Sequence, residues 1–186
     1  MKLSSGKFIV LSIIIVGLVA FFYYAIRVEP ERLEITSLDL KIEGAFPKRG
    51  IIKIVHLSDL HIQKIRDFHR RLIEAVNGLD PDIIVITGDL VQSWGEPEPA
   101  VEFASALTAP LGIWAVLGNI DLTLKDHGRL SDLLGKNNIR VLKNERLKLS
   151  REDLEFHLTG IAPYAEEDDI RGAMSGTDPA LPHIVL

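Results

Sequence analysis

Residues 51–63 of the chain read IIKIVHLSDLHIQ. The first half of this stretch is a run of apolar, mostly β-branched residues, which is typical of a buried strand in a parallel sheet. The run ends abruptly, and the polar residues Ser58, Asp59 and His61 follow. Asp59 and His61 are two residues apart, so on an extended backbone both side chains point to the same side. A carboxylate beside an imidazole at the carboxyl end of a strand makes half of a metal site.

The same pattern of an apolar strand followed by a polar residue returns twice. The stretch IVITGD ends at Asp89, and the stretch WAVLGN ends at Asn119. Asp59, Asp89 and Asn119 are therefore 30 residues apart, about the length of one strand–helix–strand unit. Neighbouring parallel strands place such residues along one edge of the sheet, where open α/β sheets bind ligands.

Asp, Asn and Gly are also common in ordinary turns after strands, so each position alone would carry little weight. The shared register and the presence of His61 favour a metal site over unrelated turns. The metal-binding residues that we predict are Asp59, His61, Asp89 and Asn119. No side chain is assigned a catalytic role.

These residues resemble the ordered signature of the calcineurin-like metallophosphoesterases. The match consists of D-x-H at 59–61, G-D at 88–89 and G-N at 118–119, and the similarity runs from about residue 51 onward. The chain is similar in particular to the membrane-associated, YkuE-like branch. The resemblance implies an α/β/β/α sandwich, in which a second sheet packs on the mostly parallel sheet that the strand–helix alternation predicts.

The resemblance also implies hydrolysis of phosphate mono- or diesters with two divalent metal ions as cofactors. Asp59, His61 and Asp89 would hold one ion, and Asp89 would bridge to a second ion that Asn119 also binds. Two ions about 3.5–4 Å apart activate a water and clamp the phosphoryl oxygens. Carboxylate, imidazole and amide ligands suit Mn, Fe, Zn or Mg, and spacing does not choose among them.

The chain departs from the family pattern at two places. The histidine that usually follows the Gly-Asn pair is Ile120 here, which can neither donate a proton nor bond to a phosphoryl oxygen. Asp121, which would help to orient that histidine, is expected to lack its partner. The family's C-terminal metal-binding histidines are absent, and His183 begins a strand rather than ending one. We therefore expect a domain whose C-terminal part is missing.

Three functions stay open on the sequence alone. The first is a membrane-anchored metallophosphoesterase. The second is a catalytically impaired remnant or a non-enzymatic binding protein of the same fold, which Ile120 and the absent histidines favour. The third is an unrelated α/β module, such as a receiver-like domain with carboxylates at its strand ends. That third function explains His61 and the constant spacing poorly.

Residues 8–26, FIVLSIIIVGLVAFFYYAI, form an uncharged apolar run. As a helix it would span about 28 Å, close to the ~30 Å hydrocarbon core of a bilayer. Lys2 and Lys7 precede the run and Arg27 follows it, with mixed charges beyond. The positive N-terminal flank favours a cytoplasmic N-terminus and an extracytoplasmic domain. We expect a single-pass anchor in the cell membrane; a cleaved signal peptide and a buried core helix are the alternatives.

The chain of 186 residues fits one domain with an N-terminal appendage. We predict a transmembrane anchor over residues 1–27, a linker and first strand over 28–50, and a truncated phosphoesterase domain over 51–186. Alternation with a slip of phase predicts a bulged strand at 33–42, and a turn is expected at 44–50.

The charge of the chain limits its partners. There are 21 Lys and Arg against 26 Asp and Glu, a net charge of −5, and no cysteine. Residues 1–27 hold three of the basic residues and none of the acidic ones, so the rest of the chain carries −8. No basic patch stands out, which argues against nucleic-acid binding. The partners that we expect are a phosphoester substrate, with lipid-linked ones among the candidates, and the membrane through residues 8–26.

The remaining charged residues and histidines have structural interpretations. His56 and His157 lie within strands and are read as packing residues. The acidic run at 166–169 suits a helix N-terminus. A solvated helix face is favoured over phosphate contact for Arg66, His69, Arg70 and Arg71. Helices are predicted at 67–77, 100–109 and 126–135, and later strands at 139–142, 147–149, 154–161 and from 183 onward.

Overall fold

A computed structural model describes residues 5–42 and 51–186 of the chain. The chain divides into two units, Met1–Asp39 and Leu40–Leu186. The first unit contains the helix α1, Ser5–Tyr23, followed by a π-helical turn at Tyr24–Val28 and a 3₁₀ turn, η2, at Glu29–Glu31.

Helix α1 is apolar on every side, and its large apolar side chains are all exposed within the unit. The span Gly6–Val28 has 23 residues and is long and apolar enough to cross a membrane. None of its most apolar window is buried in the structure. A helix that faces water on one side would carry a polar stripe there. Near an N-terminus, the same length and composition also fit a signal sequence.

The prediction of a bulged strand at residues 33–42 was wrong, because residues 32–42 have no regular secondary structure. Leu38 and Leu40 are 80% and 76% exposed. Alternation of apolar residues makes a strand only where another strand takes up its backbone hydrogen bonds. None of the described residues pairs with this segment. The turn predicted for residues 44–50 lies outside the described residues.

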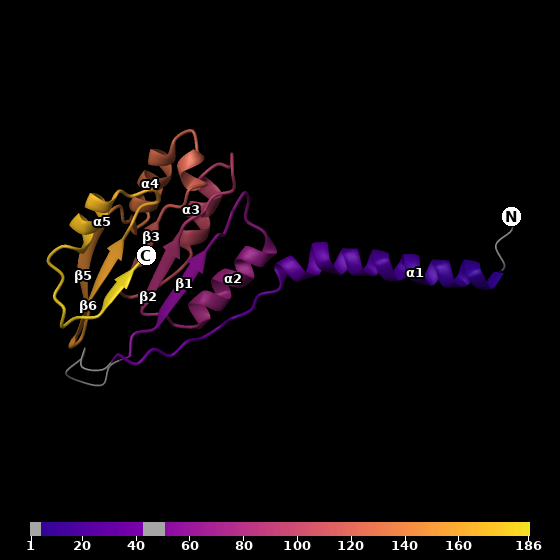
Figure 1. Cartoon of the computed structure of the whole chain (residues 1–186), viewed down its shortest axis with the longest axis horizontal. Coiled ribbons are helices and arrows are strands. Elements are labelled where there is room, and N and C mark those ends of the chain that lie inside the picture. Colours follow the sequence, from indigo (N-terminus) through magenta and orange to yellow (C-terminus); the bar gives the residue numbers. More distant parts are fainter. Residues whose placement is uncertain (1–4, 43–50) are drawn as a thin grey trace. The chain divides into compact units, whose positions relative to one another are not determined.

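The second unit begins with a sheet of four parallel strands in the order β1-β2-β3-β4 (Figure 1). Strand β2 is central and buried. The register pairs Ser58 with Thr87 and Thr87 with Val116, so the first three strands end level with one another. The strands are β1 at Ile54–Ser58, β2 at Ile83–Thr87, β3 at Ile113–Val116 and β4 at Ile139–Val141.

A helix connects each strand of this sheet to the next: α2 at Asp67–Gly78, α3 at Glu98–Ser105 and α4 at His127–Lys136. Helix α3 starts and ends earlier than the predicted range of 100–109. It begins at Glu98 because Pro99 suits the first turn of a helix. It ends at Ser105, after which the N–H groups of Ala106 and Leu107 donate to the carbonyls three residues earlier, and the N–H of Thr108 donates to Asn77 Oδ1 on α2 at 3.0 Å.

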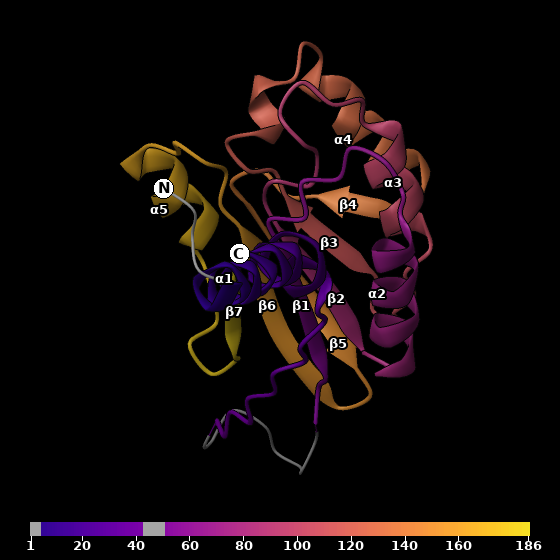
Figure 2. The same cartoon turned by 90° about the vertical axis from the view of Figure 1, so that its right-hand side faces the viewer.

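The second sheet has three strands, β5 at Glu145–Arg151, β6 at Leu154–Gly160 and β7 at His183–Val185. Strand β6 is antiparallel to β5 and parallel to β7. In Figure 2, α2, α3 and α4 line one side of the two sheets, and α5, Glu167–Met174, lines the other. Between the sheets lies an apolar core of Ile83, Val85, Val116, Leu142, Phe156 and Leu158. The layers confirm the predicted α/β/β/α arrangement.

Candidate metal centre

The loops after β1 and β2 run side by side at the carboxyl edge of the first sheet. Residue Ile62 of the first loop is fully buried and forms an isolated parallel bridge with Val91 of the second. Backbone N–H groups of the first loop donate to carbonyls of the second at 2.8–3.3 Å: Asp59 to Gly88, His61 to Asp89, and Ile62 to Leu90. The pairing of the two strands therefore continues past their ends and fixes both loops.

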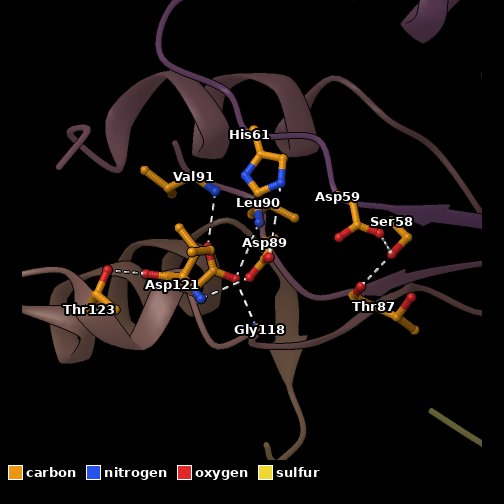
Figure 3. A network of polar contacts seen from close by, with 11 residues as sticks. Ser58, Asp59, His61, Thr87, Asp89, Leu90, Val91, Gly118, Asp121 and Thr123 are labelled. Carbon is orange, nitrogen blue, oxygen red and sulfur yellow. Dashed lines mark hydrogen bonds and ion pairs between the residues drawn. The ribbon is translucent and has the colours of Figure 1, made fainter. Parts of the chain in front are cut away.

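Asp59, His61 and Asp89 come together at this edge, with one ligand atom of each lying within 4.8 Å of the others (Figure 3). His61 Nε2 is 3.9 Å from Asp89 Oδ2, and the two side chains are 39% and 12% exposed. Two carboxylates held this close repel each other, and a divalent cation between them would offset that repulsion. Two carboxylates and an imidazole are donors that Mn, Fe or Zn accept. The residues present thus fit the metal that the resemblance implies.

The backbone brings the cluster together in a way that the sequence did not indicate. Asp59, His61 and Asp89 have φ angles of 53°, 43° and 48°, all in the left-handed region. The argument from an extended backbone was therefore wrong, although Asp59 and His61 do come together with Asp89 at one edge of the sheet. Left-handed backbone is uncommon outside glycine, and Asn, Asp and His are the other residues that adopt it most readily. Such conformations cost free energy and cluster at functional sites, although in this chain they also occur at other turns, such as Asn138 and Asn144.

The carboxylate of Asp89 lies against the loop that follows β3. Its Oδ1 accepts a hydrogen bond from the N–H of Ile120 at 2.9 Å. A Cβ placed on Gly118 would lie only 2.1 Å from the same oxygen. Only glycine leaves room for the Asp89 carboxylate at this point. The residue before Asn119 is therefore a glycine for a steric reason: any side chain there would overlap the Asp89 carboxylate.

Asp121 is fully buried, and backbone N–H groups occupy its carboxylate in place of the histidine that the family pattern would put at position 120. Its carboxylate accepts hydrogen bonds from the N–H groups of Val91, Gly118 and Leu90, at 2.9, 3.0 and 3.2 Å. Burial raises the pKa of this carboxyl above its ordinary value, while the three N–H groups act in the opposite direction. The sequence contained no signal for this role beyond a short acidic side chain in a turn, where Asp often bonds to nearby backbone.

Asp59 is exposed and is held differently from Asp89. The hydroxyl of Ser58 lies 2.5 Å from Asp59 Oδ2 and 2.7 Å from the carbonyl of Thr87, and it can donate its single proton to only one of them at a time. His56 is exposed and bonds to Thr87 Oγ1 at 2.5 Å. The interpretation of His56 as a packing residue was wrong, because its side chain is exposed. Strand β1 is an edge strand, with a neighbouring strand on one side only.

The other predicted residues lie in different settings. Asn119 is exposed in the turn between Gly118 and Ile120, and its role as a ligand stays a prediction. His157 is buried, and its Nε2 accepts the N–H of Asp178 at 3.2 Å.

The interpretation of His69 as part of a solvated face was wrong, because this side chain is 3% exposed. Its Nδ1 accepts the N–H of Arg66 at 3.0 Å, at the start of α2, and its ring packs edge-on against Phe103. Arg66, Arg70 and Arg71 are exposed, as expected for a solvated face. The acidic run opens α5, where the N–H of Glu166 donates to Asp169 Oδ2.

Comparisons with known proteins agree with this geometry. Residues 52–169 match the family described as calcineurin-like phosphoesterase. The uncharacterized metallophosphoesterase YkoQ of Bacillus subtilis is 28% identical in an alignment of 184 positions that covers 96% of this chain and 67% of YkoQ. UDP-2,3-diacylglucosamine pyrophosphatase LpxG of Chlamydia trachomatis is 32% identical over 77% of this chain and 46% of LpxG. A Bos taurus transmembrane protein with a metallophosphoesterase domain is 29% identical over 82% of this chain and 38% of its own length.

The fold and the site together define a layered α/β domain with a candidate metal centre at the carboxyl edge of its parallel sheet. The chain belongs to the calcineurin-like phosphoesterase family, as predicted. It spans between 38% and 67% of the length of the three relatives named above. Its place in the YkuE-like branch stays a prediction.

Proposed function

We propose that the protein is a membrane-anchored phosphoesterase that hydrolyses phosphate mono- or diesters with two divalent metal ions. The observation that carries the proposal is the meeting of Asp59, His61 and Asp89 at one sheet edge in a chain of this family. These three residues would hold one ion, and Asp89 and Asn119 would hold the second. The ions would supply an activated water and positive charge for the phosphoryl oxygens.

The residues of the chain have distinct tasks in this proposal. Asp89 is fixed by the N–H of Ile120 on Oδ1, while its Oδ2 is the oxygen that lies nearest His61. One N–H bond leaves a carboxylate with further lone pairs, so Asp89 keeps the capacity to serve two ions. Asp59 is exposed and His61 partly so, which leaves the cluster open to a substrate from solvent.

The membrane part of the proposal rests on the apolar span Gly6–Val28 and on the positive charge before it. The chain would then consist of an anchor at residues 1–27, a linker at residues 28–50 and an extracytoplasmic catalytic domain at residues 51–186. The relative LpxG is named for hydrolysing the pyrophosphate of a diacylated sugar nucleotide. A phosphoester that carries a lipid is the substrate class that suits an enzyme held at a bilayer.

A second candidate function is metal binding without hydrolysis. It is favoured by Ile120, which offers only its backbone N–H to the site. A side chain that donates to the phosphoryl group or transfers a proton contributes about 10²–10⁴-fold in rate. A chain without that side chain could keep its metal centre and lose most of its activity.

The test compares the wild-type chain, purified whole in detergent, with Asp89→Asn and with Asp132→Asn as a matched control. Asp132 is an exposed carboxylate on α4. Mn(II) affinity is measured by calorimetry, and hydrolysis with p-nitrophenyl phosphate and its bis ester. We expect Asp89→Asn to weaken Mn(II) binding by at least about tenfold and Asp132→Asn to change nothing. Binding without turnover would select the second function, and a wild-type chain that binds no Mn(II) would reject both.

A further inference from the structure

The loops after β2 and β3 hold each other through carboxylates that cross between them (Figure 3). Asp89, on the loop after β2, accepts the N–H of Ile120 on the loop after β3. Asp121, on the loop after β3, accepts the N–H groups of Leu90 and Val91 on the loop after β2. The two loops that carry Asp89 and Asn119 are thus clasped in both directions, and we call these crossed hydrogen bonds the Asp89–Asp121 clasp.

The half of the clasp that Asp121 makes is sealed from solvent. Asp121 and Val91 are 0% exposed and Leu90 is 1% exposed, so water cannot take over as the acceptor of these N–H groups. The carbonyl of Leu90 also accepts the N–H of Ile62 on the loop after β1. A movement of the Leu90 backbone would therefore also move the loop that carries His61.

We infer that Asp121 is the positioning residue of the metal centre: its carboxylate fixes the spacing between the loop of Asp89 and the loop of Asn119. This inference rests on the metal centre proposed above. It gives Asp121 a task that needs no histidine at position 120, because its partners are backbone N–H groups.

The arrangement of donors explains why a carboxylate is required. Asp121 Oδ2 accepts from Leu90 and Gly118, and Oδ1 accepts from Val91. An ionised carboxylate is an acceptor on both oxygens, whereas an amide has one oxygen and one NH₂ donor. In Asp121→Asn, at least one buried N–H would face another donor. The loops would have to move apart to relieve that contact.

The experiment measures Asp121→Asn against a matched control, Asp82→Asn, in the whole chain in detergent. Asp82 is also a buried carboxylate, 7% exposed, that accepts a backbone N–H, from Lys53 at 2.8 Å, and pairs with Arg151. It lies before the first residue of β2, at the opposite end of the strand from the site. Two quantities are measured: Mn(II) affinity by calorimetry, and hydrogen exchange of the metal-free chain at single-residue resolution.

We expect Asp121→Asn to weaken Mn(II) binding by about 10–100-fold, as is usual for a residue that orients a metal ligand. Exchange at the amides of Leu90 and Val91 should accelerate by at least about tenfold. Asp82→Asn should lower the thermal midpoint but leave Mn(II) affinity within about twofold of the wild type, because it does not touch the site.

Three results would overturn the inference. The first is an Asp121→Asn chain that binds Mn(II) within twofold of the wild type. The second is an Asp82→Asn chain that loses as much Mn(II) affinity at an equal loss of thermal midpoint, which would make the effect one of general stability. The third is unchanged exchange at Leu90 and Val91. If the wild type binds no Mn(II), the proposed function fails, and the exchange rates alone decide whether Asp121 holds the two loops.

Discussion

Replacing Gly118 by alanine would test the geometry of the site with a single methyl group. A Cβ at this position would lie 2.1 Å from Asp89 Oδ1, 2.4 Å from Asp89 N and 2.8 Å from Asp89 Cγ. Ordinary contacts of a Cβ begin at about 3.4 Å, so the two loops would have to separate by about 1 Å. The Asp89 N atom belongs to the backbone, so a change of rotamer cannot relieve the overlap.

The expected cost has two parts. Overpacking of this kind destabilises by about 1–3 kcal/mol, which in a chain of this size lowers the thermal midpoint by about 2–12 °C. The displacement also moves the Asp89 carboxylate relative to His61 and Asp59. We therefore expect Mn(II) affinity to fall by at least about tenfold, the usual effect of disturbing the support of a metal ligand.

The assay is thermal unfolding together with Mn(II) calorimetry, and the control is Gly135→Ala. Gly135 lies in α4, and a Cβ there would meet nothing within 4 Å. Alanine in a helix is about 0.5–1 kcal/mol more favourable than glycine, so the control should be neutral or slightly stabilised and bind Mn(II) as the wild type does. A Gly118→Ala chain with wild-type unfolding and affinity would refute the placement of the Asp89 carboxylate against Gly118.

Two further predictions concern pH and topology. Burial, and then the neighbouring His157 and Arg146, lower the pKa of His183 below its ordinary 6.5, so the unfolded chain binds its proton first as the pH falls. The free energy of unfolding should therefore decrease as the pH falls from about 6.5 to the lowered pKa. In His183→Asn this dependence of the free energy of unfolding on pH should vanish within that window. An unchanged dependence would exclude His183 as its source. The full chain should remain in membranes during alkaline carbonate extraction, and protease added to intact spheroplasts should reach the domain of residues 51–186; a soluble chain, or a domain protected until lysis, would contradict the proposed topology.

The parallel sheet and the edge at which Asp59 and Asp89 meet could be predicted because both depend on local patterns that repeat. Each apolar strand is followed by a polar residue, and successive polar residues of this kind are 30 positions apart. Neighbouring parallel strands bring such positions to one edge of the sheet. The structure places Asp59 and Asp89 there for this reason. The left-handed backbone at Asp59 and His61 could not be predicted, because it is imposed by hydrogen bonds to the loop after β2 and not by the residues themselves.

The errors share a physical cause, which is that the outcome depended on contacts distant in the chain. The alternating segment at residues 33–42 forms no strand, because none of the described residues pairs with it. His69 was assigned to a solvated face together with the neighbouring arginines, whereas it shares the buried face of Leu72 and Val76 and its ring packs on Phe103 of α3. The role of Asp121 was missed for the same reason, because its partners are N–H groups about 30 residues earlier and at Gly118. Periodicity reports which face a residue occupies but not which group will meet it there.

The two proposed functions differ at Ile120 but not at the metal centre. The backbone of Ile120 keeps its structural task, since its N–H still donates to Asp89 Oδ1, and only the side chain has lost its chemistry. Asp121 is likewise satisfied by backbone groups, so the absence of a histidine leaves no buried carboxylate oxygen without a donor. The support of Asp89 is therefore independent of the residue type at position 120. Metal binding is expected under either function, and the rate of phosphoester hydrolysis is the property that separates them.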